Sequence, residues 1–161
     1  MPREVPEEGL VGVLQDVRGH VSDMSYDLAI TSERLIAAVV REPAEIPPRI
    51  TMTELLLGDS LSRLRTLVEA PKEVERRRNL YANRTFDELV TAYHRNFELR
   101  FADVERLHLK KGLTTFRLTF HLSNPHEAGV HRFRFTLKRK RLGQAMELFG
   151  RALPTRLHPE G

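Results

Sequence analysis

Three of the seven histidines lie within eleven positions of one another and are the first candidates for metal chemistry: His121, His126 and His131. Imidazole is a common ligand for zinc and copper. Apolar residues take even positions in the run that ends near His121 and odd positions in the run after His131. This alternation predicts that His121 faces the polar side of a sheet and His131 its core side, so only a β-bulge could bring both to one metal. We predict surface and sheet-rim histidines here, and no metal site.

The sequence carries no other recognisable catalytic motif. It has no cysteine, which excludes thiol nucleophiles, zinc ribbons, iron–sulfur centres and disulfide frameworks. No Gly-x-Ser-x-Gly elbow, Ser-x-x-Lys pair or phosphate-binding glycine-rich loop occurs. Paired carboxylates such as Asp87 with Glu88 and Asp103 with Glu105 fit a helix cap and solvated faces. We predict that the protein is not an enzyme and uses no cofactor.

Basic side chains gather on the polar side of three predicted strands. If the alternating apolar residues face the core, one outer surface, here called the basic face, carries Arg106, His108, Lys110, Arg117, Thr119, His121, Arg132, Arg134 and Thr136. Neighbouring antiparallel strands bring such residues close together, and like charges placed opposite one another are mildly destabilising. None of the nine positions is acidic. An anion, a partner or acidic groups from elsewhere in the chain are therefore expected to offset the charge.

Four further cations follow at the start of the last predicted helix, where the helix dipole disfavours positive charge. The predicted contact residues are Arg106, Arg117, Arg132, Arg134, Lys138, Arg139, Lys140 and Arg141. Two interpretations stay open, a surface for an anion or an acidic partner, and a merely solvated sheet face. Nucleic acid fits less well, because the strand phenylalanines lie on the apolar side and leave no stacking platform, and no helix-turn-helix is present.

The charge of the chain is divided unevenly along its length. Residues 1–60 carry a net charge of −6 and residues 61–161 a net charge of +10, which together give +4. Such asymmetry fits an anionic partner for the basic part, and it fits equally an acidic part that folds against the basic part.

Hydrophobic periodicity places these residues on elements. Strands are expected at 10–18, 26–30 and 34–40, and then in the region 97–137, where apolar residues alternate. Between these two groups, a stripe from Met52 to Val68 has helical spacing, residues 72–78 form a solvated charged helix, and Thr85 with Glu88 has the spacing of a capping box. A final amphipathic helix spans about 139–153. The pattern predicts the α+β class with an antiparallel meander.

The ends and the location of the chain are predicted from composition. Residues 1–9 and 154–161 hold proline, glycine and charge with little apolar content, and we expect both to be disordered. No targeting segment is evident, and the longest apolar run, Leu35–Val40, is far shorter than the roughly 18 residues of a spanning helix. We expect a cytoplasmic protein with no integral membrane span.

Two stretches resemble motifs of prokaryotic pleckstrin-homology-like (PH-like) and GRAM-type domains. The first is the hairpin Ile30-Thr31-Ser32-Glu33-Arg34-Leu35-Ile36. The second is a helix with Asp87-Glu88-Leu89-Val90 followed by the segment 96–112, which begins Asn96-Phe97 and ends at Gly112. The resemblance covers residues 10–153, with a helical insertion at about 51–93. No lipid-binding motif of the family can be carried over residue by residue.

The resemblance implies a PH-like antiparallel β-barrel or roll of about seven strands, closed by a carboxyl-terminal helix. It also implies a binding module, since members bind lipid headgroups or peptides, or assemble with themselves. We therefore predict a non-catalytic interaction module that binds a protein partner or an anionic lipid surface through its basic face. The alternatives are a homo-oligomeric scaffold assembled through the inserted helices, with the Met52–Val68 stripe at the contact, and a non-specific nucleic-acid binder.

Overall fold

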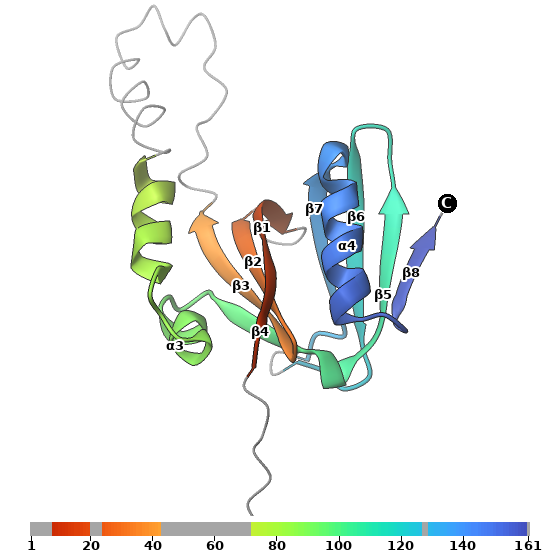
Figure 1. Ribbon diagram of the computed structural model, residues 1–161, viewed down its shortest axis with the longest axis horizontal. Helices are drawn as coiled ribbons and strands as arrows, with labels where there is room; N and C mark the ends of the chain where they lie inside the picture. The colour runs from red at the N-terminus through yellow and green to blue at the C-terminus, as the bar shows by residue number, and fades with distance from the viewer. Residues whose placement is uncertain (1–7, 20–23, 43–71, 127–128, 161) are drawn as a thin grey trace, which may run out of the picture.

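The computed structural model describes residues 8–19, 24–42, 72–126 and 129–160 (Figure 1). Its strands are β1 (Leu10–Gly19), β2 (Ser25–Thr31), β3 (Arg34–Arg41), β4 (Phe97–Arg100), β5 (Val104–Lys111), β6 (Thr115–Leu122), β7 (Arg132–Lys138) and β8 (Leu157–Glu160). Its helices include α3 (Phe86–Thr91), α4 (Leu142–Ala152), the short 3-10 turns η2 (Phe101–Asp103) and η3 (Arg139–Arg141), and a helix at 72–81. The predicted stripe Met52–Val68 lies outside the described residues.

The strands form one sheet in the order β4-β3-β2-β1-β7-β6-β5-β8, so the predicted α+β class is confirmed. Every described pair is antiparallel except β5 with β8, which is parallel. The two outermost strands, β4 and β8, do not pair with each other within the described residues, so the sheet is not closed. The chain leaves β4 through η2, which redirects it into β5 without a ladder between these strands. A closed barrel of seven strands is therefore not what the described residues show.

Strand β8 lies where we expected a disordered end. Leu157, His158, Pro159 and Glu160 face Leu107, His108, Leu109 and Lys110 of β5. Composition could not predict this strand, because it is short, exposed and contains a proline. Main-chain pairing holds it at the edge of the sheet, and it needs little apolar burial.

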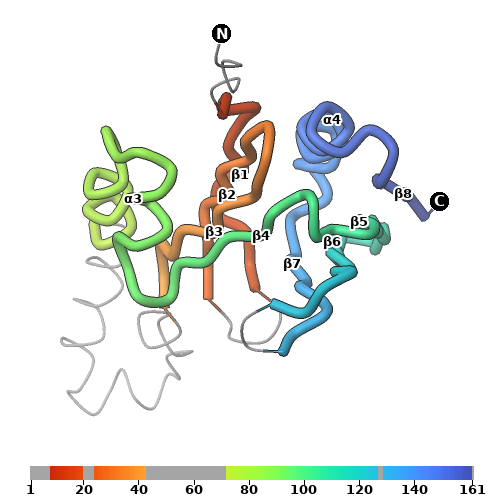
Figure 2. The backbone as a smooth tube through the Cα atoms, turned by 90° about the horizontal axis from the view of Figure 1, so that it is seen from below, coloured from red at the N-terminus to blue at the C-terminus, as the bar shows by residue number. Residues whose placement is uncertain are grey.

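Helix α4 covers the concave side of the sheet (Figures 1 and 2). Ala145, Leu148 and Phe149 are its buried residues, and they join a core built from the inner sides of the strands. Gly12 of β1 permits this packing, since a Cβ at that position would collide with the Leu148 side chain. The predicted helix is confirmed, with its first three residues wound as η3.

The helix at 72–81 packs against the sheet and is not the fully solvated helix that its charges predicted. Val74 and Arg77 are buried, and the Tyr81 hydroxyl donates to the carbonyl oxygen of Val39 at 2.5 Å. The amide nitrogen of Val39 donates to Asn96 Oδ1 at 2.8 Å. Strand β4 pairs only with the first half of β3, so these two side chains satisfy the edge of β3 beyond the end of β4.

Residues of both motifs on which the family resemblance depends form hydrogen bonds that stabilise the fold. The Thr31 hydroxyl accepts the amides of Glu33 and Arg34 at 3.2 and 2.9 Å, which fixes the turn between β2 and β3. Asn96 is buried and also donates to the carbonyl of Leu89 at 2.9 Å, which ties α3 to the sheet. The capping box at the start of α3, Thr85 with Glu88, is confirmed.

Candidate anion-binding face

Strand register brings the nine residues of the basic face onto one outer surface, as the alternation predicted. The first row across β5, β6 and β7 is Arg106, His121 and Arg132; the second is His108, Thr119 and Arg134; the third is Lys110, Arg117 and Thr136. Their neighbours in sequence point to the core, where Leu109, Leu118 and Phe135 are almost fully buried. Because successive side chains of a strand point to opposite faces, the sheet has one apolar, buried side and one cationic, outer side here.

The pKa of His121 is affected by burial and by the charges of this face. Burial is the largest cause that lowers its pKa below the usual value, followed by the positive charges of Arg106 and Arg132 and the influence of His108. Glu105 opposes the shift. The rings of His108 and His121 lie edge to face with their centroids 6.0 Å apart. The lowered pKa of His121 therefore reflects burial first and the neighbouring positive charges second.

Two residues that sequence reasoning missed adjoin the face. Arg18 of β1 faces Thr136 and extends the third row by one strand. Glu160 of β8 faces Lys110, and its carboxylate lies 3.3 Å from His108 Nε2. The face thus gains an acidic residue at its β8 margin, which the nine predicted positions do not have. Neither neighbour had a local signal, because both depend on which strands pair at long range.

The predicted cations 138–141 lie at one end of this face. Lys138 is opposite Thr115, and Arg139 is bound to the β5–β6 turn, with its amide 3.0 Å from the carbonyl of Thr114 and its guanidinium 3.2 Å from that of Gly112. Arg141 donates to Gln144 at 3.3 Å. In the described part of the chain, none of the eight predicted contact residues forms an ion pair with a carboxylate.

Acidic residues of the amino-terminal part pair elsewhere. Arg78, in the helix at 72–81, contacts Asp27 at 2.7 Å and Asp16 at 3.2 Å. The hydrogen bond to Asp27 is the largest cause that raises the pKa of Arg78. Acidic and basic parts of the chain do fold against each other here, yet this contact leaves the basic face uncompensated.

The three candidate metal-binding histidines are divided between different surroundings. His121 lies on the basic face beside His108, whereas the His126 ring packs edge to face on Phe133, with centroids 5.3 Å apart. His131 precedes β7 and is exposed, so our prediction that it faces the core is wrong. The reason is that β7 begins only at Arg132, so the alternation does not extend to His131. Among the described residues, no group of three metal-ligating side chains comes together.

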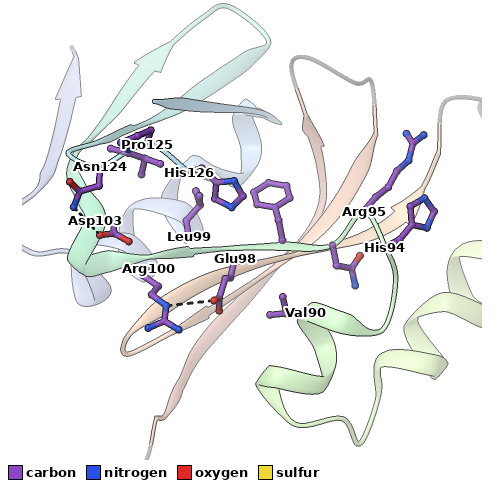
Figure 3. Close-up of a pocket in the computed structure, with 13 residues that line it drawn as sticks. Val90, His94, Arg95, Glu98, Leu99, Arg100, Asp103, Asn124, Pro125 and His126 are labelled. Atoms are coloured by element: carbon purple, nitrogen blue, oxygen red, sulfur yellow. Dashed lines mark hydrogen bonds and ion pairs between the residues drawn. The ribbon is translucent and has the colours of Figure 1, made fainter. Parts of the chain in front are cut away.

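A cavity of about 510 Å³ lies along β4 (Figure 3). Its walls combine β4 with the end of the α3 segment and the loop that follows β6, including Arg95, Glu98, Arg100, Asp103 and His126. Arg100 Nε lies 3.5 Å from Glu98 Oε1. Cations and carboxylates alternate around this cavity, so it lacks the single sign of charge that distinguishes the basic face.

We compared the chain with known protein families, curated proteins and solved structures. The chain matches no protein-family model, no curated protein and no solved structure. No helix among the described residues is long and apolar enough to span a membrane.

Proposed function

We propose that this protein is a non-catalytic interaction module that binds an anionic partner through its basic face. The observation that carries the proposal is the row Arg106, His121 and Arg132, in which two arginines flank a histidine and no carboxylate lies opposite them. Exposed guanidinium groups held on a rigid sheet are suited to carboxylates and phosphates, because their fork of donors is pre-organised.

We also propose that the domain is PH-like. The support is the meander of antiparallel strands with one carboxyl-terminal amphipathic helix across it, together with the two motifs around Thr31 and Asn96. A PH-like domain is a binding module, which agrees with a face that carries charge and no catalytic group.

The test of the basic face uses the double charge reversal Arg132→Glu/Arg134→Glu. We expect the full chain to bind immobilised poly-L-glutamate and to be released by salt, because exposed charges are screened over about 8 Å at physiological ionic strength. The variant should bind about tenfold more weakly, since two favourable contacts worth up to ~1 kcal/mol each become repulsive. The measurement is a binding isotherm at several salt concentrations.

The matched control is Arg84→Glu/Arg95→Glu, which changes the net charge equally at two exposed positions away from the basic face. The control should stay close to the unaltered chain. Equal losses in both variants would show that only net charge matters, and would overturn the assignment of the site.

A further inference from the structure

The turn between β5 and β6 exposes a leucine almost completely. Leu113 is 92 % exposed, well above every other large apolar side chain in the described residues. The turn is tight, since the amide of Gly112 donates to the carbonyl of Thr115 at 2.8 Å and Lys111 pairs with Phe116. Turn tips usually carry glycine, asparagine or aspartate. An apolar side chain at this position gains nothing from the fold, which suggests that it is used elsewhere.

Cations from β5, from the end of β7 and from η3 lie at the same end of the sheet as this leucine. Lys110, Lys111, Lys138, Arg139 and Lys140 are exposed, and together with Leu113 they define what we call the basic tip. Arg139 is bound to the turn through Thr114 and Gly112, so the start of α4 and the turn lie at the same end of the sheet (Figure 1). Glu160 is the nearest carboxylate that the strand pairing identifies, and it is directed to His108.

A shallow depression of about 170 Å³ adjoins the basic tip on the basic face. Its lining combines cations, hydroxyl groups and one glycine: Lys110, Lys111, Gly112, Thr115, Arg117 and Thr136. Lys110 and Arg117 lie directly opposite each other across β5 and β6. Ammonium, guanidinium and hydroxyl donors around one concave point are the groups that recognise a phosphate.

An exposed leucine beside a small basic depression matches the layers of an anionic bilayer, in which charged headgroups lie outside an apolar interior. The cations would lie among the headgroups, and the leucine would enter the acyl boundary a few ångströms deeper. A protein partner fits less well, because a single convex side chain cannot form the broad apolar centre that such interfaces need. Nucleic acid fits less well too, because leucine offers no ring for base stacking.

We propose that the basic tip docks on anionic phospholipid bilayers, with a lipid phosphate between Lys110 and Arg117 and with Leu113 inserted beneath the headgroups. This inference goes beyond the proposed function, because it places a bilayer against the basic tip and the third row of the basic face and leaves the first row out of the contact. It also fixes how the molecule is oriented on the bilayer, with the β5–β6 turn toward the membrane. The first row of the basic face, with Arg106 and Arg132, lies four residues along β5 from Lys110, which is about 13 Å and beyond the range of an exposed charge at physiological salt.

The experiment uses the full chain and phosphatidylcholine vesicles that contain about a quarter phosphatidylserine, an anionic fraction that gives a surface potential of tens of millivolts. The chain has no tryptophan, so Leu113→Trp introduces a single fluorophore at the tip. We expect its emission to shift to the blue when vesicles are added. Leu80→Trp, at an exposed leucine of the helix at 72–81, is the control and should not shift. Sedimentation without a blue shift of Leu113→Trp would overturn the insertion.

Two further comparisons separate apolar insertion from charge. Leu113→Ser should weaken vesicle binding about tenfold, as expected for losing the burial of one leucine, and should leave poly-L-glutamate binding unchanged. Lys110→Glu/Arg117→Glu should weaken vesicle binding more than Arg106→Glu/Arg132→Glu, although both alter the net charge equally. Equal effects of the two charge reversals, or vesicle binding by Leu113→Ser at full strength, would overturn the docking geometry.

These outcomes are distinguishable from failure of the proposed function. A chain that binds poly-L-glutamate through Arg132 and Arg134 but ignores the vesicles would keep the interaction module and overturn the bilayer as its partner. A chain that binds neither probe would overturn both proposals. The variants change exposed residues, apart from the half-buried Arg134, so circular dichroism and thermal unfolding should match those of the unaltered chain.

Discussion

His121 shows at the scale of one residue how the basic face affects stability. Its folded pKa is lowered, first by burial and then by Arg106 and Arg132, whereas in the unfolded chain it titrates near its ordinary value of about 6.5. Between these two values the unfolded state holds more protons than the folded state. The contribution of His121 to stability is therefore fully present above about pH 6.5, and it is lost as the pH falls through the folded pKa.

We predict that His121→Gln reduces the loss of stability between pH 7 and pH 5, because glutamine takes up no proton. Urea unfolding at the two pH values measures this. The control is His94→Gln, an exposed position away from the basic face. An identical pH dependence in His121→Gln and in the unaltered chain would contradict a lowered pKa of His121 in the folded state.

Asn96 acts at the scale of the element, because it satisfies the edge of β3 and anchors α3. Its side chain accepts from Val39 and donates to Leu89, and it is buried. Asn96→Ala leaves both main-chain groups without this partner, so we expect a loss of about 1–3 kcal/mol in the free energy of unfolding. Urea denaturation measures the loss, and hydrogen exchange at the Val39 amide should accelerate.

The control for Asn96 is Asn124→Ala, which removes an exposed amide 3.5 Å from Asp103 and should change stability by less than about 0.5 kcal/mol. If both variants lost the same stability, the burial of Asn96 would not be what makes it important.

Elements with strong periodicity could be predicted from the sequence, and elements held by long-range pairing could not. Strand β6 alternates over eight residues, and β5 alternates from Arg106 to Lys110, after a bulge between Val104 and Arg106. The residues assigned to their outer side are found there. The short strand β8 has no such pattern, and Arg18 joins the basic face only because β1 pairs with β7. The cavity beside β4 was missed for the same reason, since its walls come from three separate segments.

Arg34 acts at the scale of the whole molecule, because it joins segments that are far apart in the sequence. Its side chain is only 11 % exposed, and the guanidinium contacts Glu8 before β1, Glu98 on β4 and Asp87 on α3 at 2.6 to 2.8 Å. Burial lowers the pKa of Arg34, but its hydrogen bonds to these carboxylates outweigh that and raise the pKa overall, so it stays charged.

We predict that Arg34→Met destabilises the fold by about 3–5 kcal/mol, because it leaves the partly buried carboxylates of Glu8 and Glu98 without their cation. Arg100→Met is the control, since Arg100 is 69 % exposed and lies 3.5 Å from the same Glu98; its effect should be near zero. Chemical denaturation compares the two. A small loss for Arg34→Met would mean that the three contacts do not hold the segments together.

Strand β8 has a consequence for how copies of the chain behave toward one another. It occupies the hydrogen-bonding side of β5 that would otherwise face water, although little of the core depends on it. A chain shortened to Arg156 would keep its buried centre and present a bare row of main-chain donors and acceptors, which can template the addition of strands from other molecules. The four residues of β8, of which only Leu157 packs against the core, thus protect the edge of β5 from self-association and contribute little to folding.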